Sequence, residues 1–171
     1  MSAVPLAEVN ALDQARFTSL LGAVFEHSSW VAESAWRARP FPTVDALHAA
    51  MMAAVRDAGR ERQLSLIRAH PELSGREASE GSLTADSTSE QGRLGFLTLT
   101  RAELDRMARL NRAYREKLGF PCIVALRLHA TRESVMQEME RRAALGMDEE
   151  VDNALGQIAH ITRGRLDRLV A

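Results

Sequence analysis

Apolar residues recur at helical spacing along most of the chain, and this spacing limits the possible folds more than any other feature. Ala, Leu, Arg and Glu, all strong helix formers, are the commonest residues of the 171. One short apolar run, Cys122 to Leu128, resembles a strand, but no second strand candidate exists to pair with it. We therefore predict an all-α protein, with a single compact domain over residues 1–171 and about seven or eight helices.

Capping residues and helix breakers predict the helix boundaries. A side-chain oxygen at the N-cap accepts a hydrogen bond from the first turn, whereas Gly and Pro end a helix. The first helix, capped by Asn10, is expected to carry its buried stripe as far as Phe25. The Cys122–Leu128 run is expected to be a buried extended segment or a short helix. Further helices are expected to start at or just after Ser29, Thr43, Glu61, Ser87, Thr100, Thr131 and Asp148.

The helical pattern disappears between Pro71 and Asp86. This stretch is polar, contains glycine and has no repeated apolar face. A loop of this length inside a compact domain is uncommon, and such loops are usually functional or mobile. It is therefore the first place to look for chemistry.

Charge and composition argue against several classes of protein. The chain has 22 basic and 23 acidic residues, so it lacks the basic excess typical of nucleic-acid binders. A single cysteine, Cys122, rules out an intramolecular disulfide framework and fits a reducing compartment. No apolar run approaches the ~20 residues that span a bilayer, and no signal peptide is evident. We expect a cytoplasmic protein that binds neither nucleic acid nor a membrane.

Among the polar residues, one histidine stands out because it lies at the start of the irregular stretch. The sequence contains no metal-ligand spacing, glycine-rich phosphate loop or nucleophile elbow, so we predict no metal site. His70 precedes Pro71 at the mouth of the irregular stretch. It is either a helix C-terminal histidine that interacts with the helix dipole or a general acid–base group.

Two further features allow both a structural and a functional interpretation. Ser87 and Glu90 have the spacing of a capping box, and the same spacing places them together beside free N–H groups at a helix N-terminus. In the last helix, Arg163 or Arg165 could bind a carboxylate through its two-pronged guanidinium. Two positions turn a helix by about 200°, so these two arginines cannot face the same pocket.

A series of short motifs, in order along nearly the whole chain, resembles the family of OHCU decarboxylase, the 2-oxo-4-hydroxy-4-carboxy-5-ureidoimidazoline decarboxylase of urate degradation. Phe25-Glu26-His27-Ser28 and the C-terminal stretch from Ile158 to Leu166 are also similar to it. The central motifs are Ala69-His70-Pro71-Glu72-Leu73, Leu83-Thr84, Ser87-x-x-Glu90-Gln91, Leu110-Asn111-x-x-Tyr114 and Gly119-Phe120-Pro121-x-Ile123.

The resemblance implies an all-α, homodimeric enzyme without a cofactor, which converts OHCU to (S)-allantoin and carbon dioxide. It implies that His70 is the catalytic histidine and that Glu90 acts beside it. The substrate contacts implied by the resemblance are Pro71, Ser87, Thr88, Ser89, Gln91, Cys122, Ile123, Val124, Ala125, Leu126 and Arg165.

Departures from the family pattern keep alternatives open. Cys122 and Leu118 stand where the family more often has aromatic residues, Glu72 replaces a frequent aspartate, and Gly164 replaces a larger apolar residue. One alternative is a related lyase that acts on another ureide or carboxylated heterocycle. The other is a helical interaction module in which Ser87 and Glu90 only cap a helix and His70 only closes one.

Overall fold

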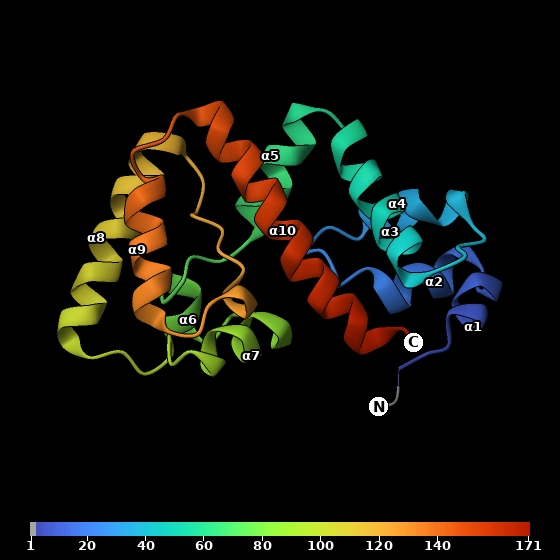
Figure 1. The fold of residues 1–171 in the computed structure, drawn as a ribbon, viewed down its shortest axis with the longest axis horizontal. Coiled ribbons are helices and arrows are strands. Elements are labelled where there is room, and N and C mark those ends of the chain that lie inside the picture. Colours follow the sequence, from blue (N-terminus) through green and yellow to red (C-terminus); the bar gives the residue numbers. More distant parts are fainter. Residues whose placement is uncertain (1–2) are drawn as a thin grey trace. The chain divides into compact units, whose positions relative to one another are not determined.

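A computed structural model describes residues 3–171, and helices make up most of this chain (Figure 1). Between residues 3 and 171 the extended pairing is limited to one isolated bridge, from Val4 to Val170, so the all-α prediction is confirmed. The helices are α1 (Leu6–Ala11), α2 (Gln14–Leu21), α3 (Trp30–Ala35), α4 (Val44–Asp57), α5 (Arg60–Ala69), α6 (Arg76–Glu80), α7 (Ala85–Arg93), α8 (Arg101–Leu118), α9 (Arg132–Arg142) and α10 (Met147–Leu169), with 3-10 turns η1 (Trp36–Ala38) and η2 (Leu126–Leu128).

The described chain divides into two compact units. The first contains the chain up to Ala69 together with Ala159–Ala171, and the second contains His70–Ile158. One domain over residues 1–171 stays a prediction, and each unit is described by itself. Within residues 3–171, no helix combines the length and the apolarity needed to cross a bilayer.

The start of the first unit differs from the prediction made for Asn10. Instead of one helix from Asn10 onward, α1 ends at Ala11, and α2 is capped by Asp13, whose carboxylate accepts from the Arg16 N–H at 2.8 Å. The Asn10 amide pairs with the backbone of Phe41, donating at 2.9 Å and accepting at 2.8 Å. The Asn10 side chain, which the local pattern predicted as a helix cap, thus forms a long-range contact with Phe41 instead.

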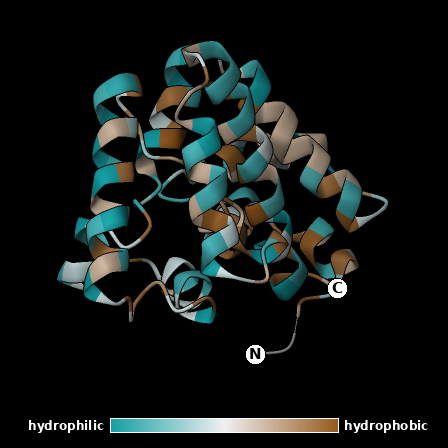
Figure 2. Cartoon of the chain, turned by 60° about the vertical axis from the view of Figure 1, so that its left-hand side comes forward, coloured by the Kyte–Doolittle hydropathy of each residue, from teal (hydrophilic) through white to brown (hydrophobic). Residues whose placement is uncertain are grey.

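In the second unit, α8 and α9 lie side by side (Figure 1). Arg106 of α8 joins them, with a Glu133 oxygen at 2.7 Å and a Glu140 oxygen at 2.9 Å. Figure 2 shows hydrophilic and hydrophobic residues on the same helices, as expected of helices with one buried face. Thr100, an expected helix start, forms a capping box with Glu103 at the start of α8.

Of the two interpretations left open for Ser87 and Glu90, the capping box is wrong. The irregular stretch contains the short helix α6, and α7 begins at Ala85, before Ser87. Thr84 is the N-cap, and its hydroxyl accepts from the Ser87 N–H at 3.3 Å. Asp148 is likewise not a cap, because α10 begins one residue before it. The position of Ser87 inside α7 therefore requires an explanation other than capping.

Replacement of Thr84 by Ala should lower the free energy of unfolding by about 1 kcal/mol, because it removes the cap of α7. Thr88→Ala is the matched control, since its exposed hydroxyl only bonds back to the Thr84 carbonyl of its own helix, at 2.9 Å. The control should change stability by less than about 0.5 kcal/mol. Urea unfolding followed by circular dichroism measures both, and equal losses would contradict the assignment of the cap.

Candidate active site

Helix α7 separates the predicted site residues onto two sides. Ser87 and Gln91, four positions apart, are both buried, and Glu90 is half-buried. Thr88 and Ser89 are exposed. The structure therefore places Ser87 and Gln91 on an inner face of α7 but does not bring Thr88 and Ser89 to that face.

His70 follows the last residue of α5 and is buried. The segment after it is tied to α7 by the Gln91 amide, whose oxygen accepts from the Ser74 N–H at 2.9 Å. The Gln91 amide nitrogen lies 3.5 Å from the Glu72 carbonyl. Gln91, predicted to contact the substrate, thus also holds the backbone that follows the catalytic candidate.

Helix α8 holds the same segment from another side. The buried Asn111 amide donates to the Leu73 carbonyl at 2.9 Å, and Arg115 donates from its Nε to a Glu72 carboxylate oxygen at 2.7 Å. Ser74 adopts a left-handed conformation, with φ of 47°, and its hydroxyl donates to the Phe96 carbonyl. A non-glycine residue seldom adopts this conformation, so the surrounding hydrogen bonds stabilise an unusual turn after His70.

Residues 122–126 of the run expected to be buried are buried irregular backbone, whereas Arg127 and Leu128, in the 3-10 turn η2, are exposed. Three elements anchor residues 122–126 through hydrogen bonds to their backbone. Arg93 of α7 donates to the Leu126 carbonyl, Arg142 of α9 donates to the Ile123 carbonyl, and Gln157 of α10 accepts from the Ala125 N–H at 2.9 Å. Helix α7 is thus connected both to the segment after His70 and to this one.

These connections explain how the second unit gathers most of the predicted site residues. His70 and Pro71, the inner face of α7, and Cys122–Leu126 all belong to this unit. The interaction-module alternative relied on Ser87 and Glu90 serving as a capping box. The N-cap of this helix is Thr84 instead.

Arg165 is the buried arginine of the pair considered in the last helix, and it belongs to the first unit. Its guanidinium donates to a Glu26 carboxylate oxygen at 2.7 Å, and each side chain is at most 2% exposed. Arg163 is partly exposed and pairs with Asp45 and Asp167. Glu26 comes from the motif Phe25-Glu26-His27-Ser28, so that motif provides the partner of the buried arginine.

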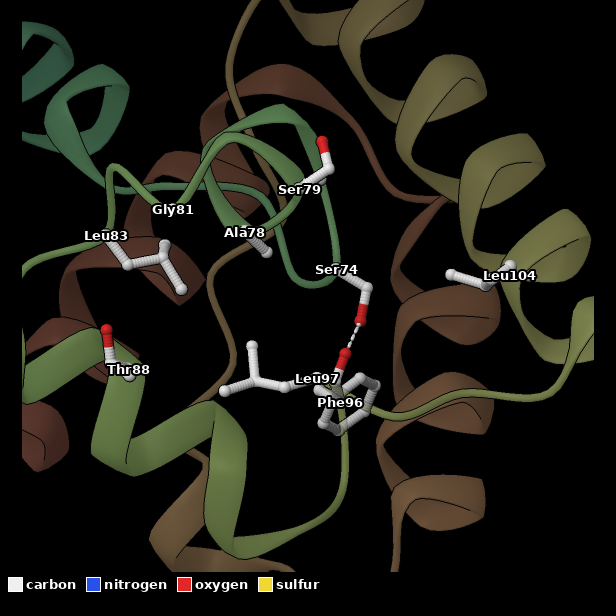
Figure 3. Close-up of a pocket in the computed structure, with 10 residues that line it drawn as sticks. Ser74, Ala78, Ser79, Gly81, Leu83, Thr88, Phe96, Leu97 and Leu104 are labelled. Atoms are coloured by element: carbon white, nitrogen blue, oxygen red, sulfur yellow. Dashed lines mark hydrogen bonds between the residues drawn. The ribbon is translucent and has the colours of Figure 1, made fainter.

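A pocket of about 430 Å³ in the second unit does not coincide with the predicted site (Figure 3). Leu83 and Leu97 point toward one another across it. Thr88 is the predicted site residue that lines it, from the outer side of α7, and neither His70 nor Ser87 does so. Its walls are Ser74, Gly75, Ala78, Ser79, Gly81, Leu83, Thr88, Phe96, Leu97 and Leu104.

Several supporting residues were missed by sequence reasoning. Asn111 and Tyr114 lie in a quoted motif, which could have indicated their buried polar contacts. Arg142, Glu150 and Gln157 gave no such signal, because charged and amide residues on helices are usually exposed. No group of three or more His, Cys, Asp or Glu side chains within residues 3–171 has the arrangement of a metal site.

Comparison with known proteins decides the family. The OHCU decarboxylase family model matches residues 10–167. The chain belongs to the OHCU decarboxylase family. It is 40% identical to the 2-oxo-4-hydroxy-4-carboxy-5-ureidoimidazoline decarboxylase of Haloferax volcanii, over 97% of this chain and 96% of that one. It is 33% identical to the mouse protein of the same name, over 96% and 92% of the two chains.

Two solved structures share the fold of this chain. A crystal structure of (S)-allantoin synthase superposes with a TM-score of 0.77 at 31% identity. That match covers 97% of this chain and 54% of the other, so this chain spans about half of that solved protein. A crystal structure of OHCU decarboxylase in the presence of (S)-allantoin has a TM-score of 0.65 at 20% identity and supports the fold.

Native Cys122 should react very slowly with a thiol reagent at pH 8. Burial raises the pKa of its thiol to about 11, so the reactive thiolate is scarce and enclosed. Timed labelling with a chromogenic disulfide measures this, with protein unfolded in urea as the control that reacts at once. Rapid labelling of the native protein would contradict the burial of the Cys122 thiol.

Proposed function

We propose that this protein catalyses the decarboxylation of OHCU to (S)-allantoin and carbon dioxide in urate degradation. The family match over residues 10–167 carries the proposal. It is supported by the way hydrogen bonds connect the segment after His70, helix α7 and Cys122–Leu126 within one unit. The protein is thus a carboxy-lyase of the family to which it belongs.

The substrate's own structure accounts for the residue types. Its carboxylate leaves from a ring carbon that bears a hydroxyl group and adjoins an imine carbon. The electron pair of the broken carbon–carbon bond moves into this conjugated system, so a separate electron sink is not required. The imine nitrogen takes up a proton, and the hydroxyl loses its proton as a carbonyl forms. A second proton added to one face of the former imine carbon sets the configuration of allantoin.

His70 is proposed as the general acid–base group that moves these protons, because histidine is the side chain best suited to do so near neutral pH. Glu90 is proposed to orient His70 and to contact the hydroxyl or ureido group. Ser87 and the backbone of Cys122–Leu126 would hold the polar ring, and the buried apolar side chains of this segment would exclude water. The role that the resemblance implies for Arg165, binding the polar substrate, stays a prediction.

Three properties implied by the family resemblance complete the proposal. The enzyme is proposed to act without a cofactor, as a homodimer and in the cytoplasm. Sedimentation at several protein concentrations would test the dimer, and activity after exhaustive dialysis against a chelator would test cofactor independence.

The loss of freshly generated OHCU, followed by its ultraviolet absorbance, tests the proposed function. The protein should accelerate this loss well above the spontaneous rate and release carbon dioxide in equal amount. No acceleration would contradict the proposal and favour a related lyase with another ureide or carboxylated heterocycle as substrate. The same assay with such compounds would identify that alternative.

His70→Asn should lower the rate constant by about 100- to 10,000-fold, the usual contribution of a positioned acid–base group.

Glu90→Gln should also lose activity, with a change in stability below about 1 kcal/mol, because Thr84 and not Ser87 caps the helix. Circular dichroism checks that both variants keep their helices. Unchanged turnover of a folded His70→Asn protein would overturn the role proposed for His70.

A further inference from the structure

Two opposite charges, neither of them among the residues proposed to touch the substrate, are buried together in the second unit. Arg142 of α9 and Glu150 of α10 have 1% and 0% of their side-chain surface exposed. One terminal nitrogen of the Arg142 guanidinium lies 2.9 Å from a carboxylate oxygen of Glu150. The Arg142 Nε lies 3.1 Å from each of the two carboxylate oxygens. Asn153 donates to Glu150 at 2.7 Å, and the Tyr114 hydroxyl also donates to it.

The remaining terminal nitrogen of Arg142 does not contact the carboxylate. It donates instead to the Ile123 carbonyl, in the middle of Cys122–Leu126. The fork of a guanidinium is planar and rigid, so a carboxylate that fixes one side of the plane also fixes the direction of the other. Glu150 therefore determines where Arg142 holds the Ile123 carbonyl.

Two more side chains form hydrogen bonds to the backbone of this segment. Gln157 accepts a hydrogen bond from the Ala125 N–H, and Arg93 donates one to the Leu126 carbonyl. Among residues 3–171, neither the N–H nor the carbonyl of Val124 forms a hydrogen bond to another residue, although Val124 is buried. Buried backbone groups are almost always paired, so a position left open between clamped neighbours is suited to a polar ligand.

We propose that Arg142, oriented by Glu150, is a positioning residue that fixes Cys122–Leu126 so that the Val124 peptide group is presented to the substrate. This inference rests on the proposed function, in which the segment holds the polar ring. Arg142 does not touch the substrate. It acts through the Ile123 carbonyl on the position of the neighbouring peptide group.

The double variant Arg142→Met with Glu150→Gln tests the inference. It avoids leaving one buried charge unpaired, and similar replacements of buried ion pairs often keep a protein folded. Tyr114→Phe is the matched control, because it removes a hydrogen bond to the same carboxylate but leaves the Arg142 link to Ile123 in place. Circular dichroism identifies a temperature at which all the proteins are folded. Arg142→Lys replaces the double variant if that protein does not fold.

The double variant should have a KM for OHCU about 10- to 100-fold higher, as expected when a binding group is displaced by about 1 Å. Its product should also show a lower enantiomeric excess. Tyr114→Phe should keep both values close to those of the wild type. Equal KM and enantiomeric excess in the double variant and the control, at matched loss of thermal stability, would overturn the inference and leave Arg142 a purely structural role.

Hydrogen exchange gives a readout that does not depend on activity. Amides in a peptide covering residues 120–128 should exchange faster in the double variant than in Tyr114→Phe, because the Arg142 link to the segment is missing. Equal exchange would contradict the positioning role even if the wild-type protein proved inactive. An inactive wild-type protein with the expected exchange difference would instead contradict only the proposed function.

Discussion

The buried ion pair between Arg142 and Glu150 links several elements of the second unit to one irregular segment. Removing two charges from water costs several kcal/mol for each ion, and the attraction between them repays this cost only with good geometry and further hydrogen bonds. Tyr114, Asn153 and the Ile123 carbonyl supply those hydrogen bonds. The pair thereby connects α8, α9, α10 and the irregular segment at residues 122–126.

Buried polar side chains also hold the turn after His70 and pair with a candidate arginine. Gln91 and Asn111 hold the turn after His70 through its backbone groups. In the first unit, Glu26 holds the buried Arg165. A helix satisfies its own backbone, whereas an irregular buried segment needs partners from side chains. Several residues of the family motifs are therefore supports of the backbone as well as candidates for chemistry.

The sequence predicted the helical class and several boundaries because these depend on local signals. The caps Thr43 and Thr131 and the capping box at Thr100 are present as expected. Asn10 was misassigned because its amide finds a better partner 31 residues away. Ser87 was misassigned because Thr84, three residues earlier, competes for the same local role and begins the helix sooner.

The candidate site was less predictable than the fold. Spacing alone left His70 and Ser87 with both structural and functional interpretations, and the family resemblance gave them their expected roles. Nothing in the local pattern distinguished Arg142, Glu150 or Gln157 from the exposed residues of other helices. The burial of Arg142 and Glu150, and the contact of Gln157 with the Ala125 N–H, arise from packing against a segment 19 or more residues away, and such contacts have no local signal.

The proposed active site is held by polar anchors and adds a proton to one face of the intermediate that remains after carbon dioxide leaves. The configuration of allantoin formed from freshly generated OHCU, measured by chiral chromatography, tests this claim most directly. Protonation in free solution has no preferred face and gives a racemic product. A clear excess of (S)-allantoin is expected with the wild-type protein, and a racemic product would rule out protonation on one face by the enzyme.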